Sequence, residues 1–123
     1  MDEKNEKKTE SSCGKTQNPI SLKDVKSVKA LDGIFRRTLA YNEETMLCHF
    51  DMKKGAKIPL HDHIHVQIGY VIKGKIKFFT ENGEFIASAG DSYVFDSNEK
   101  HGAELLEDSE VIEVFSPCRS EYK

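Results

Sequence analysis

Short apolar runs separated by polar turns make up most of the chain after Ile20. Runs rich in β-branched and aromatic residues predict strands, and they lie at residues 35–41, 45–52, 67–72, 75–80, 84–88, 92–95, 103–106 and 111–115. The pair Asn82-Gly83 is typical of a hairpin turn, because both residues tolerate a positive φ. Only residues 22–31 could form a brief helix. Many short strands at regular intervals predict an all-β sandwich or barrel.

The first part of the chain differs in composition from the rest. The stretch MDEKNEKKTESSCGKTQN is almost entirely polar, so it cannot bury enough surface to offset the entropy lost on ordering. We therefore expect residues 1–18 to form a disordered tail and residues 19–123 to form one folded domain.

The composition also bears on partners and compartment. The tail lacks the apolar segment of a signal peptide, and no apolar run is long enough to cross a bilayer. The three cysteines, Cys13, Cys48 and Cys118, share no metal or redox spacing. These features predict a cytoplasmic protein with reduced thiols and no membrane partner. The net charge of −3 gives no basic surface for nucleic acid.

Three histidines carry the strongest chemical signal. His61 and His63 lie two residues apart in GAKIPLHDHIHVQIGYVIKG, and His101 follows in GDSYVFDSNEKHGAE. Imidazole is the commonest metal ligand at neutral pH, and side chains at i and i+2 of a strand share one face. If the sheet folds back on itself, as in a small barrel, Gln67 and His101 can complete the site. The pattern predicts a site for one divalent ion, and Zn²⁺, Ni²⁺, Fe²⁺ and Mn²⁺ all suit such ligands.

The spacing of these residues resembles the two sequence motifs of the cupin family. The first motif corresponds to Gly55, His61, His63, Gln67 and Gly74, with Gln67 where glutamate is usual. The second corresponds to Gly90 and His101, with other residues in place of the usual Pro, Gly and Asn, namely Asp96, Asn98 and Leu105. The resemblance implies a cupin jelly-roll β-barrel, which agrees with the strand pattern, and a homodimer.

The neighbours of the predicted ligands leave several alternatives open. We interpret His49 as an ordinary strand residue. His65 could support a metal ligand without binding the ion or could be merely exposed, and we favour an exposed or rim position. Gln67 could bind the ion through its amide oxygen or simply lie in the pocket. Three imidazoles and an amide leave the charge of the ion uncompensated, which favours an anionic substrate. Gly69 leaves room above the ion, marks a bulge or a close backbone approach, or does both.

The last apolar run, in EVIEVFSPCR, contains an acidic residue. Glu113 shares one strand face with Val111 and Phe115, whereas Ile112 and Val114 share the other. If the first face points into the barrel, Glu113 is a buried carboxylate and a candidate general acid or base. Burial would raise its pKa, and a nearby metal or arginine would lower it. If the second face points inward, Glu113 is solvated; the pattern favours neither arrangement.

A closer resemblance is to the pectin-degradation branch of the cupins, through QIGYVIKG and the closing VFSPCRSEY. That branch uses glutamine as the fourth metal ligand and ends in the pattern acid-x-Phe-x-x-x-Arg. The resemblance implies an enzyme that converts 4,5-unsaturated uronates into linear keto-uronates. It implies Glu113 and Arg119 as catalytic residues, and Phe115, Arg119 and Tyr70 as substrate-binding residues. This chain has Glu113 where aspartate is usual and Cys118 where proline is usual.

Two other functions fit the same predicted metal site. An Fe²⁺-dependent cupin dioxygenase would use the coordination positions that a weak Gln67 leaves open. A non-catalytic small-ligand-binding or sensor cupin would bind its ligand without turnover. In each case we expect the partner to be a small anionic molecule, such as a carbohydrate or a keto acid.

Overall fold

The computed structural model describes residues 13–123 and shows ten strands and two short 3-10 turns in that part of the chain. The strands are β1 (Val28–Leu31), β2 (Ile34–Tyr41), β3 (Met46–Met52), β4 (Lys57–His61), β5 (Val66–Lys73), β6 (Lys75–Thr80), β7 (Gly83–Ser88), β8 (Ser92–Phe95), β9 (His101–Leu105) and β10 (Ser109–Ser116). The turns are η1 (Leu22–Asp24) and η2 (Ser120–Tyr122). The predicted all-β class is confirmed.

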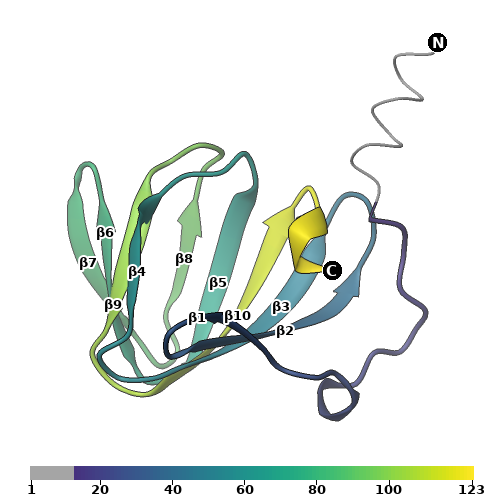
Figure 1. Cartoon of the computed structure of the whole chain (residues 1–123). Coiled ribbons are helices and arrows are strands. Elements are labelled where there is room, and N and C mark those ends of the chain that lie inside the picture. The colour runs from purple at the N-terminus through teal and green to yellow at the C-terminus, as the bar shows by residue number, and fades with distance from the viewer. Residues whose placement is uncertain (1–12) are drawn as a thin grey trace.

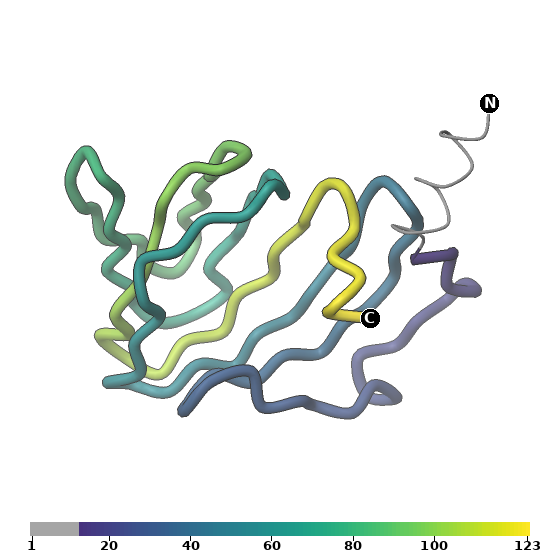
Figure 2. The backbone as a smooth tube through the Cα atoms, turned by 45° about the horizontal axis from the view of Figure 1, so that its top comes forward, coloured from purple at the N-terminus to yellow at the C-terminus, as the bar shows by residue number. Residues whose placement is uncertain are grey.

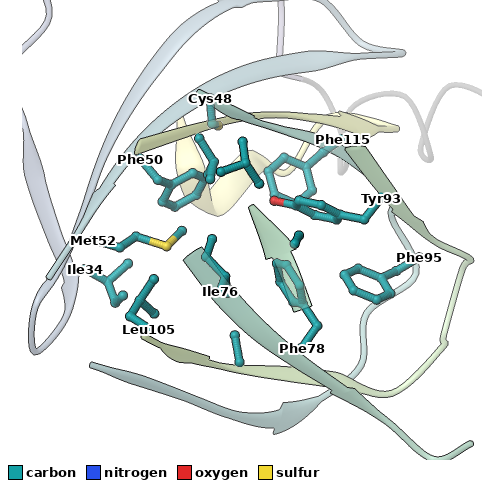
Figure 3. Close-up of a cluster of buried hydrophobic side chains, with 14 of the residues drawn as sticks. Ile34, Cys48, Phe50, Met52, Ile76, Phe78, Tyr93, Phe95, Leu105 and Phe115 are labelled. Atoms are coloured by element: carbon teal, nitrogen blue, oxygen red, sulfur yellow. The ribbon is translucent and has the colours of Figure 1, made fainter. Parts of the chain in front are cut away.

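The strands form two antiparallel sheets that face each other and enclose one core (Figure 1). One sheet has the order β1-β2-β3-β10-β5-β8, and the other has the order β4-β9-β6-β7. Because side chains alternate along a strand, each sheet contributes one apolar face to the core. Figure 3 shows Phe50 and Phe115 of the larger sheet and Ile76 and Phe78 of the smaller one meeting between the sheets. This is the predicted jelly-roll barrel.

The eight strands expected from the sequence are all present, and their ends differ from prediction by at most two residues. The hairpin at Asn82-Gly83 is confirmed as the turn between β6 and β7. Two short strands at sheet edges, β1 and β4, were not among the predicted runs; β4 contains Pro59, which edge strands tolerate. The prediction of a helix at residues 22–31 is wrong beyond the single turn η1, because β1 pairs with β2.

The described chain begins near its C-terminal segment (Figure 2) and is linked to that segment covalently. Cys13 is buried and forms a disulfide with Cys118. The backbone N–H groups of Cys13 and Gly14 donate to the carboxylate of Glu43 at 3.0 and 2.9 Å, in the turn between β2 and β3. The N–H of Cys118 donates to the Glu43 carbonyl at 3.2 Å. The turn therefore joins both ends of the described chain.

The prediction of reduced thiols is wrong for Cys13 and Cys118, since a disulfide between residues 105 positions apart leaves no signal in local spacing. Cys48 is buried and is the free cysteine among the described residues. Of the predicted tail, residues 1–12 lie outside the described part of the chain. Between residues 13 and 123 there is no helix with the length and apolarity to span a membrane. The cytoplasmic location stays a prediction.

Candidate metal and anion site

His61, His63 and His101 converge at one end of the barrel. His61 is the last residue of β4 and pairs with His101, the first residue of β9. His63 lies in the loop after β4 and not on the strand itself, so the expected strand face holds only His61. One nitrogen of each imidazole lies within 4.8 Å of the others. The three rings can therefore reach a single metal ion.

Backbone carbonyls fix the tautomer of all three rings. Nδ1 of His61 lies 2.8 Å from the carbonyl of Pro59, Nδ1 of His63 lies 2.9 Å from that of His65, and Nδ1 of His101 lies 2.8 Å from that of Glu99. A carbonyl oxygen can only accept, so each Nδ1 carries the hydrogen and each Nε2 presents a lone pair. Metal-binding histidines are commonly oriented by such outer hydrogen bonds.

Burial favours the neutral form of two of these imidazoles. It lowers the pKa of His63 and lowers that of His101 to about 4. Nε2 of His101 is buried and has no hydrogen-bond partner among the described residues. An unpartnered lone pair in a buried position is costly, and a metal ion would satisfy it. The His101 ring is also stacked on Phe95, with centroids 4.3 Å apart.

Gln67 belongs to the same cluster. Its Nε2 donates to Glu113 Oε2 at 2.8 Å, which turns its Oε1 toward His63 Nε2 at 3.1 Å. With His63 protonated on Nδ1, both of these facing atoms are acceptors and repel each other. A cation bound between them removes the conflict. The chemistry of the donor set therefore fits a divalent metal ion held by three imidazoles and one amide oxygen.

A row of residues across three strands places Glu113 beside this cluster. Glu113 of β10 is paired with Gly69 of β5 in the strand register, and Gly69 is paired with Tyr93 of β8. The Tyr93 ring lies over Gly69, in the space that a Cβ there would occupy, and its hydroxyl donates to Glu113 Oε2. Gly69 thus makes room for the side chain of Tyr93, a contact that the sequence did not indicate.

Glu113 points into the barrel, which decides between the two strand faces considered from the sequence. It is buried together with Val111 and Phe115. Burial raises the pKa of its carboxyl group, and the hydrogen bonds from Tyr93 and Gln67 and the charge of Arg119 act in the opposite direction. The net result is a carboxylate that takes up a proton more readily than an exposed glutamate. Such a group suits proton transfer.

A cavity of about 320 Å³ opens beside these groups. Its polar lining includes His61, His101, Gln67, Glu113 and Arg119, and much of the remaining wall is apolar. The volume is at the lower end of the range for small-molecule sites. The structure thus brings Glu113, Phe115 and Arg119 to the same cavity as His61 and His101.

The C-terminal segment forms part of the cavity wall. Arg119 follows β10, and its guanidinium packs on the rings of Phe115 and Tyr122, with Cζ 5.1 and 4.1 Å from their centroids. It also forms a salt bridge with Glu121 at 3.2 Å. Planar stacking and a carboxylate partner are the contacts that a guanidinium makes best.

Not every predicted residue reaches the cavity. Tyr70 lies on the outer face of β5, is 46% exposed, and is absent from the cavity lining, so the structure does not bring it to the candidate substrate site. His49 is a buried residue whose Nε2 lies 2.6 Å from Glu110 on the outer face of the larger sheet. His65 is half-buried, and its carbonyl orients His63.

Three residues of the site were not identified from the sequence: Tyr93, Tyr122 and Arg36. Tyr93 alternates with Phe95 along β8, which marks both as inward residues but does not show that Tyr93 meets Glu113. Tyr122 and Arg36 line the cavity, and Cζ of Arg36 lies 3.9 Å from the Tyr122 centroid. Their positions depend on strand pairing and on the fold of the C-terminal segment.

Comparison with known proteins agrees with this geometry. Residues 48–116 match the family model of the cupin domain. The chain is 37% identical over 93 residues to the pectin degradation protein KdgF of Dickeya dadantii (strain 3937), an alignment that covers 74% of this chain and 84% of that protein.

Two solved structures share most of the fold. An RmlC-like cupin from Shewanella frigidimarina NCIMB 400 superposes with a TM-score of 0.84 at 26% identity, over 89% of this chain and 98% of that one. KdgF from Halomonas sp. superposes with a TM-score of 0.82 at 32% identity, over 88% and 100%. The chain belongs to the cupin family, and within it to the branch that resembles the pectin degradation protein KdgF.

Proposed function

We propose that this protein is a metal-dependent cupin enzyme that opens 4,5-unsaturated uronates to linear keto-uronates. The observation that carries the proposal is the meeting of two residue sets in one cavity: the metal-ligand cluster and the acid-x-Phe-x-x-x-Arg residues Glu113, Phe115 and Arg119. The similarity to a pectin degradation protein supports a uronate as the substrate class.

In this proposal His61, His63 and His101 hold one divalent ion through Nε2, with the amide oxygen of Gln67 as a weaker fourth ligand. The bound ion would act as a Lewis acid toward an oxygen of the sugar. His61→Ala should abolish stoichiometric metal, whereas Gln67→Ala should lower the affinity without abolishing it. Elemental analysis of the purified variants checks both outcomes. Full metal content in a variant that lacks both His61 and His63 would contradict the ligand assignment.

The reaction is an isomerisation. The C1–O5 bond of the sugar ring breaks, the anomeric hydroxyl loses its proton as C1 becomes an aldehyde, C4 gains a proton, and C5 becomes a ketone. In our proposal Glu113 holds the proton that is moved; both of its hydrogen bonds end on Oε2, so Oε1 is left to face the sugar. Arg119 binds the substrate carboxylate, and the apolar wall excludes water.

Two substitutions test these roles. Glu113→Gln keeps the shape of the side chain and removes the proton, so binding should persist while turnover falls by about 10²–10⁴-fold. Arg119→Ala should weaken uronate binding by roughly tenfold or more. The assay is loss of the ultraviolet absorbance of unsaturated galacturonate. Glu110→Gln, on the outer face of the same strand, is the matched control. Unchanged kinetics in Glu113→Gln and Arg119→Ala would contradict the proposed reaction.

The same assays separate the alternatives. Oxygen uptake that depends on Fe²⁺ would identify a dioxygenase, and tight uronate binding without turnover would identify a binding module. No observation of the site favours either over the isomerase.

We also propose that the protein forms a homodimer through the outer face of β5 and β8. Ile68, Tyr70 and Val94 are 51%, 46% and 56% exposed there, and Ile68 is level with Val94. An apolar patch of this kind is typical of an interaction surface. Light scattering should give twice the chain mass, and Ile68→Lys should give a monomer. A wild-type monomer at micromolar concentration would contradict this arrangement.

A further inference from the structure

Arg36 is a charged residue that points into the barrel without an anionic partner. It shares a face of β2 with Ile34, which is buried, and it lines the same cavity as the histidines and Glu113. Its Nε is buried and has no hydrogen-bond partner among the described residues. No salt bridge found between residues 13 and 123 involves it, and its observed contact is with the Tyr122 ring.

Arg37, the next residue of β2, is an arginine with both a hydrogen-bond acceptor and an anionic partner. Arg37 points to the opposite face, donates from Nε to the carbonyl of Val25 at 3.0 Å, and forms a salt bridge with Asp51 at 3.3 Å. A buried charge is costly unless it is paired and hydrogen-bonded. Arg37 meets this condition within the protein, whereas the half-buried Arg36 has no such partner for its buried Nε among residues 13–123. An anion that enters the cavity could supply that partner.

Arg36 and Arg119 lie close to each other. Their Cζ atoms are 3.9 and 4.1 Å from the centroid of the same ring, that of Tyr122. Arg119 already donates from Nε and Nη2 to Glu121 at 3.3 and 3.2 Å, so two of its nitrogens are engaged. Two guanidinium cations on one ring repel each other, and an anion that accepts hydrogen bonds from both of them at the edge of the ring would offset this repulsion.

We infer that Arg36 is a second anchor for the carboxylate of the ligand and forms an anion clamp together with Arg119, which packs on the same Tyr122 ring. The inference rests on the proposed function for its choice of a uronate, and it adds a specificity-determining residue on β2. Tyr122 positions both arginines: its backbone carbonyl accepts a hydrogen bond from Thr38, two residues after Arg36. The clamp selects sugars with a carboxylate over neutral sugars of the same size.

The test uses the full-length, metal-loaded protein and two stable probes, D-galacturonate and its neutral counterpart D-galactose, in calorimetric titrations. The wild type should bind galacturonate more tightly than galactose. Arg36→Met keeps the packing on Tyr122 and removes the charge, so it should weaken galacturonate binding about tenfold or more and leave galactose unchanged. Arg36→Lys should be intermediate, because it keeps the charge but not the planar donors.

Arg37→Met is the matched control, because it removes the neighbouring arginine from the opposite face. It should bind galacturonate like the wild type, and urea unfolding of every variant shows whether the fold is kept. The clamp is overturned if Arg36→Met binds galacturonate within about twofold of the wild type. It is also overturned if galactose binding falls by the same factor, or if the wild type does not prefer galacturonate.

These outcomes are distinct from failure of the proposed reaction. If the wild type does not open unsaturated galacturonate but its galacturonate binding depends on Arg36, the clamp stands and the reaction is wrong. If the wild type turns the substrate over and Arg36→Met has an unchanged KM, the reaction stands and the clamp is wrong.

Discussion

The pKa of the Glu113 carboxyl group depends on its hydrogen-bond donors as well as on its burial. Its carboxyl pKa is raised by burial, and the Tyr93 hydroxyl and the Gln67 amide oppose that effect by donating to its charged form. A glutamate in the same cavity without these donors would be protonated over a wider range of pH. The donors therefore set the pH range in which Glu113 can both hold and release a proton.

Tyr93→Phe tests this control. The variant removes one donor to the carboxylate and keeps the ring, so the pKa of Glu113 should rise further. The limb of the pH–rate profile that reports Glu113 should move to higher pH, while metal content stays unchanged. Profiles of kcat/KM for unsaturated galacturonate from pH 4 to 9 measure the shift. A limb in its wild-type position, or one moved to lower pH, would show that Tyr93 does not act on Glu113.

At the scale of strands, the spacing within one segment could be predicted from the sequence, but contacts between segments could not. His61, His63, Gln67 and His101 were identified because their intervals are fixed by a local motif. The row from Glu113 through Gly69 to Tyr93 depends on the register of three strands, which no single segment specifies. For the same reason the sequence left the direction of Glu113 undecided, and it could not show that Tyr70 lies on the outer face of β5.

Gly69 connects the strand register to the site, because its lack of a side chain allows Tyr93 of the neighbouring strand to reach Glu113. In Gly69→Ala the new Cβ would overlap the Tyr93 ring. The ring would therefore have to move away from residue 69, and its hydroxyl would move away from Glu113. We expect a loss of about 1–3 kcal/mol in the free energy of unfolding, the usual cost of overpacking, together with reduced turnover. Urea unfolding measures the first effect and the uronate assay the second.

A second substitution distinguishes this contact from a general loss of strand stability. In a Tyr93→Leu background the colliding ring atoms are absent, so Gly69→Ala should cost much less there than in the wild type. Equal costs in the two backgrounds would mean that the two residues do not interact in solution.

At the scale of the whole molecule, the start of the described chain is joined to the C-terminal segment that forms part of the cavity wall. The disulfide joins Cys13 to Cys118, the residue immediately before Arg119, and Glu43 binds the backbone on both sides of it. The segment that carries Arg119 and Tyr122 is thus tied to the barrel by a covalent link as well as by ring contacts. Composition alone predicted that Cys13 belongs to a disordered tail, because it cannot show that one residue of a polar stretch is buried.

The disulfide should contribute measurably to stability. It links residues 105 positions apart, and closing a loop of this length restricts the unfolded chain strongly. Cys118→Ser should therefore lower the free energy of unfolding by about 2–4 kcal/mol, and a reducing agent should lower that of the wild type by a similar amount.

Urea unfolding with and without the reductant measures both effects. The reductant should not affect Cys118→Ser, because Cys13 has then lost its disulfide partner, and burial raises the pKa of the Cys48 thiol to about 11 and disfavours its reactive thiolate. The doubly substituted Cys13→Ser, Cys118→Ser protein should be no less stable than Cys118→Ser, since either change alone removes the bond. Equal stability of the wild type in both conditions would show that the two cysteines are not joined, and that ring packing alone holds Arg119 at the cavity.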